Sequence, residues 1–239
     1  MSLSRRYPCP SSTKESFVND IHTLLDTAAL APPLSDSDAS RLAQQLGQAA
    51  SIGVYPRSIA VAHHALFCLG KQGTEKFLLI LASEGNEVLD DFDGDRAQVL
   101  IDDQPFLLQR SPTTYTNVVA LHRRLPYTEP ITLGLATSAG SGDRLGLATP
   151  GHVRAVRKTD IMPIFTQQSI REMERTERTP KDVVNDATWG VFQEGWRDGY
   201  GADADHLKST QDIDLCREAG FIFYTFDPRE HVDNDAHTD

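Results

Sequence analysis

A stretch of eleven residues, GDRLGLATPGH (142–152), brings a carboxylate, a guanidinium and an imidazole together beside a glycine-containing turn. Asp143 could act as a general base or a metal ligand, and Arg144 could hold a substrate carboxylate through its bidentate fork. His152 could contact substrate, and it could equally have a structural or capping role. The simpler alternative for the first two residues is an Asp–Arg pair that only ties down the loop.

A second group of chemically capable residues occurs in GADADHL (201–207). The period of two in a strand places Asp203 and Asp205 on one face, with His206 opposite them or on the following turn. Two carboxylates and an imidazole at this spacing are ligands suited to a divalent ion such as Mn, Ni or Zn. A plain surface turn remains the alternative. Asp227 ends an apolar, aromatic run and is a further candidate metal ligand.

Three other polar residues complete the set of candidates. Gln167 and Gln168 close the apolar run IMPIFTQQS, where their amides could bind substrate hydroxyls. Glu194 lies near the end of a helical stretch and could serve as a catalytic acid or base, although a solvated carboxylate is the ordinary explanation.

These residues need elements that bring them to one place, and the sequence from residue 131 onward has the pattern of such elements. Strand-like apolar runs alternate with helical stretches, which predicts parallel strands joined by right-handed crossovers. Thr149 and Pro150 resemble an N-cap followed by proline at the first helical position. In parallel α/β folds the active site gathers at the carboxyl ends of the strands, where these polar residues fall. The expected strands are 131–138, 161–169, 199–207 and 221–228, and the expected helices are 151–158, 171–178, 180–196 and 209–220.

The first half of the chain has a different pattern. Residues 14–30 and 35–50 read as two helices separated by a Pro-Pro break, and the second begins with Ser and Asp caps. Three apolar runs with turn signals follow at 57–70, 76–85 and 97–109; strands are expected, although the first run could also be a helix.

The predicted organisation is a mixed α/β region (1–129) followed by β/α units (130–239). Four β/α units are visible, whereas a closed barrel needs eight. The second region is therefore expected to be either an open four-stranded sheet or the first half of a barrel.

Composition limits the kinds of partner. The chain has 239 residues and a formal net charge of -11, which argues against a binder of nucleic acid or of anionic membranes. No apolar run reaches the length of a membrane span, and the N-terminus lacks a signal-peptide core, so a cytoplasmic protein is expected. The three cysteines are far apart and form no CxxC pair, which predicts free thiols.

Several long blocks carry a resemblance to a known family. GDRLGLATPGH, FTQQSIREMERTERTPKDVVNDATWGVFQEGW, GYGADADHLK and FYTFDPREHVDN together resemble the tagaturonate epimerases, with weaker similarity at VYPRS and SPTTYTNVVALHRRLP. The resemblance implies interconversion of tagaturonate and fructuronate in hexuronate catabolism, a TIM-like barrel and a divalent cation (Mn, Ni, Co or Zn). It also implies a longer protein, so residues 130–239 are expected to be the first β/α units of that barrel.

The chemistry of this reaction suits the candidate residues. The C4 hydrogen is not adjacent to the ketone at C2, so a retro-aldol route is easier than direct proton abstraction. A base takes the C4 hydroxyl proton, the C3–C4 bond opens, the aldehyde turns and the bond closes on its other face, while a metal at the C2 and C3 oxygens stabilises the enediolate. In this hypothesis Asp143 is the base, Arg144 holds the carboxylate and Gln168 positions hydroxyls.

In the same hypothesis Asp227 or the Asp205–His206 pair binds the metal. Two alternatives stay open: a metal-dependent aldolase or isomerase of another sugar acid, and an inactive half-barrel fragment.

Overall fold

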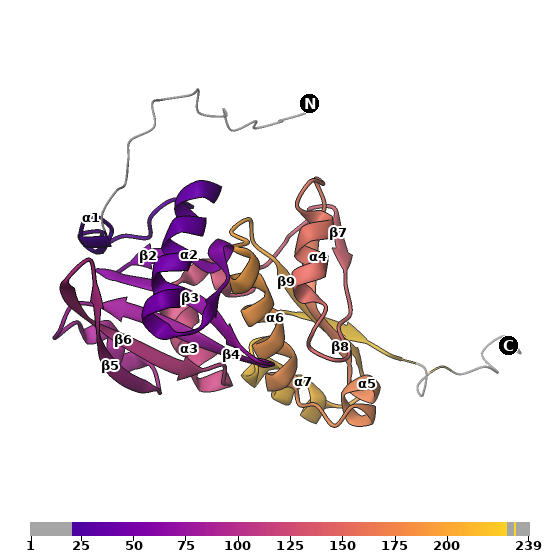
Figure 1. The fold of residues 1–239 in the computed structure, drawn as a ribbon. Helices are drawn as coiled ribbons and strands as arrows, with labels where there is room; N and C mark the ends of the chain where they lie inside the picture. The colour runs from indigo at the N-terminus through magenta and orange to yellow at the C-terminus, as the bar shows by residue number, and fades with distance from the viewer. Residues whose placement is uncertain (1–20, 229–231, 233–239) are drawn as a thin grey trace, which may run out of the picture.

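The computed structural model describes residues 21–228 and residue 232, so the first part of the helix expected at 14–30 lies outside the described residues. Within the described part the strands form two sheets, one antiparallel and one parallel, which occupy opposite ends of the molecule in Figure 1. No helix among these residues is long and apolar enough to cross a membrane.

The first sheet is antiparallel and has the strand order β1-β3-β4-β6-β5, with β2 also paired to β3. The run at 57–70, which could have been a helix, contains β2 and most of β3, joined by a turn at His63 and His64. Both turn residues have positive φ, and so do Asp102 and Asp103 in the turn between β5 and β6. The strands are β1 (Gly53–Val54), β2 (Ala60–Ala62), β3 (Ala65–Gln72), β4 (Glu75–Ala82), β5 (Asp95–Ile101) and β6 (Gln104–Pro112).

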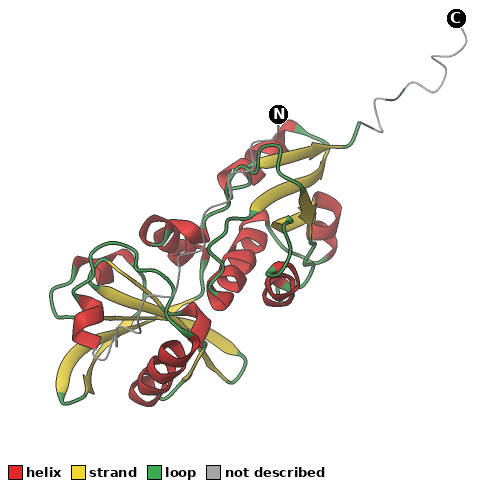
Figure 2. Ribbon diagram, turned by 90° about the horizontal axis from the view of Figure 1, so that it is seen from above, coloured by secondary structure: helices red, strands yellow, loops and turns green. Residues whose placement is uncertain are grey.

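Both faces of this sheet are covered, as Figure 2 shows. Because side chains alternate along a strand, Leu66 and Cys68 of β3 pack on one side while Phe67 and Leu69 pack on the other. The first side is covered by α1 (Ile21–Leu25) and α2 (Asp36–Ala50), and the second by α3 (Tyr115–Arg124) and α6 (Pro180–Glu194). Burial on both faces explains why β3 and β4 are apolar almost throughout. Short 3-10 helices connect these elements: η1 (Pro56–Ser58), η2 (Glu87–Asp91) and η3 (Pro126–Thr128).

The second sheet is parallel, with the strand order β10-β9-β8-β7, and therefore follows the chain order. Its helices pack on one face, where Ala202 and Ala204 of β9 meet α5, α6 and α7, and Phe165 of β8 meets α4 and α6. The strands are β7 (Ser138–Gly140), β8 (Met162–Ser169), β9 (Gly201–Leu207) and β10 (Phe223–Phe226). The helices are α4 (Thr149–Val156), α5 (Ile170–Arg175), α6 and α7 (Thr210–Glu218).

Helix α6 joins the two halves. It begins with a capping box between Thr179 and Asp182 and ends at Gly195, which adopts φ of 58°. Trp189 and Phe192 belong to the core under the antiparallel sheet, whereas Val191 belongs to the core behind the parallel sheet. The helix is therefore buried along most of its circumference. The expected boundary near residue 130 falls between the two sheets, and both sheets pack against α6.

Two local expectations are wrong. The strand expected at 131–138 is an irregular segment that contains a turn at Gly134, which has a positive φ of 59°, and the strand itself begins only at Ser138. The apolar pattern misled because Leu135 is fully exposed instead of packed. Thr149 is not the N-cap of α4 but its first residue, because Asp143 supplies the acceptor that a capping side chain would normally provide.

Candidate active site at the carboxyl ends of the parallel strands

A row of polar side chains crosses three strands on the face of the parallel sheet away from the helices. The register places Gln167 of β8 opposite Asp203 of β9. The Gln167 amide donates to one Asp203 carboxylate oxygen at 3.1 Å, and the Thr225 hydroxyl of β10 donates to the other at 3.0 Å. We call these three residues the polar row.

Asp203 is the centre of the polar row and is only 3% exposed. Burial raises the pKa of its carboxyl, while the hydrogen bonds from Gln167 and Thr225 act in the opposite direction and the nearby Asp205 raises it further. Both hydrogen-bond donors to this buried carboxylate are neutral, and neither is a cationic side chain. Such an arrangement is uncommon for a residue with a purely structural role.

The ends of β8, β9 and β10 surround a pocket of about 260 Å³. Beside it, His206 has a positive φ of 56° and its Nδ1 lies 2.7 Å from an Asp205 carboxylate oxygen. The pocket thus combines two basic side chains, two acidic ones and an imidazole, which could bind a carboxylate and exchange protons with a hydroxyl group. We call it the strand-end pocket; it is lined by Ser169, Ile170, Arg171, Glu174, His206, Lys208 and Asp227.

The predicted metal ligands are brought only partly together. His206 and Asp227 line the strand-end pocket, whereas Asp205 lies beside it and is paired with His206. Among the residues that the structure describes, no three His, Cys, Asp or Glu side chains are close enough to hold one metal ion. His231 and Asp233, two expected loop residues that follow Asp227 in the sequence and are weaker candidates for metal contact, lie outside the described residues.

Comparison with known proteins identifies the scaffold that carries this site. A family model described as tagaturonate epimerase matches residues 55–239. The chain belongs to the tagaturonate epimerase family. It is 42% identical over 181 residues to the tagaturonate/fructuronate epimerase of Thermotoga maritima, covering 76% of this chain and 36% of that protein.

Crystal structures of the fructuronate-tagaturonate epimerase of Cohnella laeviribosi, one native and one with glycerol, match with a TM-score of 0.71 at 36% identity. The match covers 85% of this chain and 39% of the crystallised chain. The chain therefore spans little more than a third of the length of these tagaturonate epimerases.

In this member of the tagaturonate epimerase family, Asp143 lies beneath its own loop. Its two carboxylate oxygens accept hydrogen bonds from the backbone N–H groups of Leu145, Leu147, Ala148 and Thr149. Burial raises the pKa of Asp143, but these four hydrogen bonds outweigh it and hold the pKa below its usual value. Asp143 therefore ties down its loop through backbone hydrogen bonds and not through the Asp–Arg pair considered above, and a carboxylate so bonded is a weak base.

Arg144 and Gln168 already have protein partners. Arg144 forms an ion pair with Glu172 across the loop, with its Nε donating at 2.6 Å. Gln168 is 1% exposed; its amide oxygen accepts from Arg178 at 2.6 Å and its amide nitrogen donates to Thr176 at 3.2 Å. Both residues support the loops around the strand ends, and neither lines the strand-end pocket.

Neither Glu194 nor His152 lines the strand-end pocket. Glu194 is 4% exposed and receives two hydrogen bonds from Arg154, at 2.6 and 3.1 Å. Glu194 is the last residue of α6, and the chain then leads to the start of β9. It therefore lies near the amino-terminal edge of the parallel sheet, whereas the strand-end pocket lies at the carboxyl-terminal edge. His152 is half-buried in α4, and its Nδ1 has no hydrogen-bond partner among the described residues.

Sequence reasoning missed several residues that the structure places at the site, among them Glu174 and Lys208 of the strand-end pocket. Thr225 completes the polar row, Arg171 lines the strand-end pocket, and Arg178 ties the Asp143 loop to Gln168 by donating to the Asp143 carbonyl oxygen at 2.7 Å. Thr225 could have been found, since it lies two residues before Asp227 in the last strand. The two arginines carried no signal, because they occur in a helix and a loop rich in charge.

Proposed function

We propose that the polar row and the strand-end pocket form part of the site at which a tagaturonate/fructuronate epimerase inverts C4 of its hexuronate substrate. The observation that carries the proposal is the position of these groups at the carboxyl ends of sequential parallel strands, in a chain of this family. That edge is where parallel α/β enzymes place their active sites.

We infer further that the parallel sheet is part of a TIM-like barrel. The strands follow one another in chain order and their helices lie on a single face, as in the wall of such a barrel. The opposite face carries Ile164, Ile222 and Phe223 around an apolar pocket of about 330 Å³, and Phe223 is 55% exposed. Apolar side chains of this kind fill the interior of barrels.

The proposed mechanism is a retro-aldol reaction. A base removes the proton of the C4 hydroxyl, the C3–C4 bond breaks as C4 and its oxygen become an aldehyde, and the electrons of that bond move into an enediolate at C2 and C3. Rotation of the aldehyde and reversal of these steps give the C4 epimer. Neither the C3 hydrogen nor the C4 hydrogen leaves its carbon, so the route needs no acidic C–H bond.

The residues of this chain suggest a revised set of roles. Arg171 faces the strand-end pocket from the first turn of α5 and would bind the substrate carboxylate, a role first expected of Arg144. Glu174 and Asp227 line the same pocket and are better placed than Asp143 to exchange the hydroxyl proton. The polar row lies on the same strands, two residues before the last paired residues of β8 and β9, and its Gln167 would hydrogen-bond substrate hydroxyls.

A divalent cation is also proposed, of the type Mn, Ni, Co or Zn. His206 and Asp227 would supply two of its ligands, with Asp205 orienting the imidazole. The described residues do not complete a site, and no step above depends on the cation. Calorimetric titration of the full chain with MnCl₂ tests the assignment: His206→Ala and Asp227→Asn should each weaken binding, and Asp160→Asn, at an exposed loop position, should not.

The epimerase proposal is tested by incubating the full chain with D-tagaturonate and MnCl₂ in D₂O and following the sugar by ¹H NMR. We expect fructuronate to form without deuterium at C3 or C4. Arg171→Gln should lose this conversion, whereas Arg175→Gln, a matched arginine on the same helix outside the pocket, should retain it. Failure of the unmodified chain to convert the sugar, or equal losses in the two variants, would contradict the proposal.

A further inference from the structure

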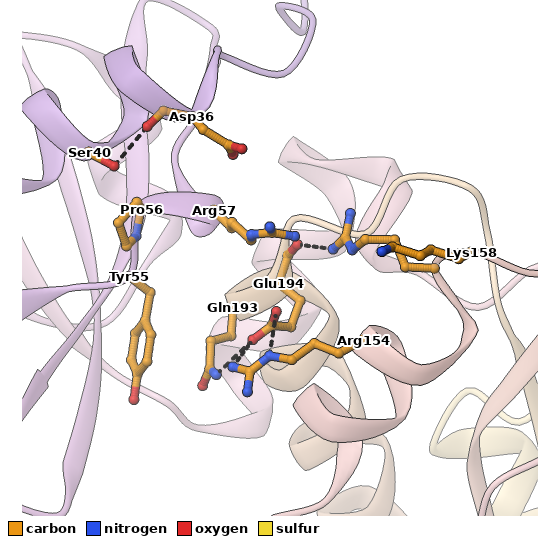
Figure 3. Close-up of a pocket in the computed structure, with 10 residues that line it drawn as sticks. Asp36, Ser40, Tyr55, Pro56, Arg57, Arg154, Lys158, Gln193 and Glu194 are labelled. Carbon is orange, nitrogen blue, oxygen red and sulfur yellow. Dashed lines mark hydrogen bonds and ion pairs between the residues drawn. The ribbon is translucent and has the colours of Figure 1, made fainter.

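A second cavity lies near the amino-terminal edge of the parallel sheet, opposite the edge that carries the strand-end pocket. It has a volume of about 470 Å³, within the range of small-molecule sites. One wall is formed by the start of α2 and by η1, and the other by the carboxyl-terminal ends of α4 and α6 (Figure 3). We call it the arginine cavity; its main lining residues are Tyr55, Arg57, Arg154, Arg157, Gln193 and Glu194.

Local backbone structure fixes both walls of the arginine cavity. Pro56 begins η1 and presents Arg57 toward α6. Opposite, Gly195 ends α6 in the left-handed conformation, and a Cβ at this position would collide with the Arg57 carbonyl oxygen. The close approach of these two backbones holds the side chains of Arg57 and Glu194 on either side of one space. The cavity therefore lies where the first half of the chain packs against the second.

The cavity has an excess of positive charge in a chain whose net charge is -11. Four cationic side chains line it, against two carboxylates, Asp36 and Glu194. Both carboxylate oxygens of Glu194 accept hydrogen bonds from Arg154. For Arg57 and Lys158 the described part of the chain shows no hydrogen bond or ion pair to an acidic side chain.

Arg157 is only partly compensated by its neighbours. One of its terminal nitrogens donates to the Glu194 carbonyl oxygen at 2.5 Å, but its Nε is buried without a partner among the described residues. Burial lowers the pKa of Arg157 and the neighbouring Arg57 lowers it further, while the carboxylates of Glu194, Asp198 and Asp36 act in the opposite direction. Two guanidinium groups held near one another in a partly buried space repel each other unless an anion lies between them.

Gln193 provides an independent indication. The residue is 6% exposed, and its amide nitrogen donates to a Glu194 carboxylate oxygen at 3.2 Å, which fixes the orientation of the amide. Its Oε1 is then left buried with no partner in the described part of the chain. Figure 3 shows this amide beside the Arg154–Glu194 pair in the cavity wall. An unsatisfied buried acceptor calls for a donor, such as a ligand hydroxyl.

We propose that the arginine cavity binds a small hydroxylated anion, with its phosphate or carboxylate oxygens between Arg57, Arg157 and Lys158. A hydroxyl of the same molecule reaches Gln193 after a small movement of the amide. The anion joins the α2–η1 wall to the α4–α6 wall, and so binding stabilises the folded chain by linkage. The site is separate from the strand-end pocket, and this inference does not depend on the proposed epimerase activity.

The test uses calorimetric titration of the full chain with inorganic phosphate and with gluconate, each against sodium chloride of equal ionic strength. We expect at least one of the two anions to bind with a dissociation constant below about 1 mM and to raise the unfolding temperature. Binding by phosphate alone or by gluconate alone identifies the preferred acid group. The proposal is overturned if neither anion binds better than chloride.

Variants locate the binding. Arg57→Gln and Lys158→Gln remove charges that have no acidic partner in the described structure, so they should leave folding intact and weaken the anion about tenfold or more. Arg123→Gln removes an exposed charge of α3 outside the cavity and should have no effect. Equal losses in Arg57→Gln and Arg123→Gln would show that only the overall charge matters and would refute the site.

A second readout is available from the indole of Trp196, whose ring centre lies 5.8 Å from the Arg157 guanidinium carbon. The chain has two tryptophans, so Trp189→Phe leaves Trp196 as the single fluorophore. Its emission should change on titration with the anion that binds, and the change should disappear when Arg57→Gln is added. An unchanged emission spectrum at saturating anion would place the binding elsewhere and contradict the proposal.

Discussion

Replacement of Asp143 separates a structural role from a catalytic one. Its Oδ1 accepts from the backbone N–H groups of Leu145 at 3.2 Å and Leu147 at 3.1 Å. Its Oδ2 accepts from those of Ala148 at 2.6 Å and Thr149 at 3.1 Å. The Thr149 hydroxyl also donates to Oδ2, at 3.5 Å. Asp143→Ala removes all of these contacts, whereas Asp143→Asn keeps one acceptor oxygen and therefore two of the four backbone hydrogen bonds.

The magnitude follows from these contacts. At about 1 kcal/mol of net stability for each hydrogen bond, the four backbone contacts give about 4 kcal/mol. Leu145, Leu147 and Ala148 are exposed, so water replaces part of what is lost. We therefore expect the free energy of unfolding to fall by about 2–4 kcal/mol in Asp143→Ala and by about half as much in Asp143→Asn.

The assay is urea unfolding of the full chain at pH 7, followed by tryptophan fluorescence. Asp160→Ala, at an exposed position in the loop after α4, serves as the matched control and should change the midpoint little. If Asp143→Ala unfolds at the same urea concentration as Asp160→Ala, the four contacts do not stabilise the loop and the reasoning fails.

The pH dependence gives an independent check of sign. The folded pKa of Asp143 is lowered, since the backbone donors outweigh the effect of burial. Its contribution is therefore fully present above the unfolded pKa of about 3.9 and is lost as pH falls through the folded pKa. The stability difference between the unmodified chain and Asp143→Asn should shrink below about pH 4. A difference that grows on acidification would contradict the assignment.

Burial lowers the pKa of His122 to about 4. The free energy of unfolding should therefore fall by up to about 3 kcal/mol as the pH is lowered from 6.5 to 4. Urea titrations should show that His122→Asn lacks this loss. Burial raises the pKa of Cys68, and that of Cys216 to about 11; in a Cys9→Ser background both thiols should react with a disulfide reagent far more slowly in the folded chain than in urea. Gly140→Ala would drive a Cβ into the Gln167 amide, which can rotate away, so we expect thermal unfolding to show a loss of about 1 kcal/mol or less.

Much of the parallel sheet could be predicted from local pattern. The runs containing β8, β9 and β10, and the helices between them, were found because apolar periodicity and capping residues are local signals. The strand expected at 131–138 failed for a physical reason: Leu133 is only half-buried and Leu135 is fully exposed, and β7 forms instead in a short glycine-containing segment. Helix α3, between the sheets, was not assigned at all.

The candidate site was less predictable than the elements that carry it. From the sequence, Asp203 was grouped with Asp205 and His206. In the structure, the strand register makes Asp203 accept hydrogen bonds from Gln167 and Thr225 instead. It also grouped Asp143 with Arg144, although the two side chains bind different partners.

The sequence by itself determined the family, the parallel strands of the second half and the edge at which polar side chains collect, because composition, periodicity and long motifs are properties of neighbouring residues. Only the tertiary structure decided which groups meet. Hydrogen bonds such as Gln167–Asp203, and the approach of Arg57 to the end of α6, join residues far apart in the chain. Their geometry depends on register and on helix packing, which no short stretch of sequence specifies.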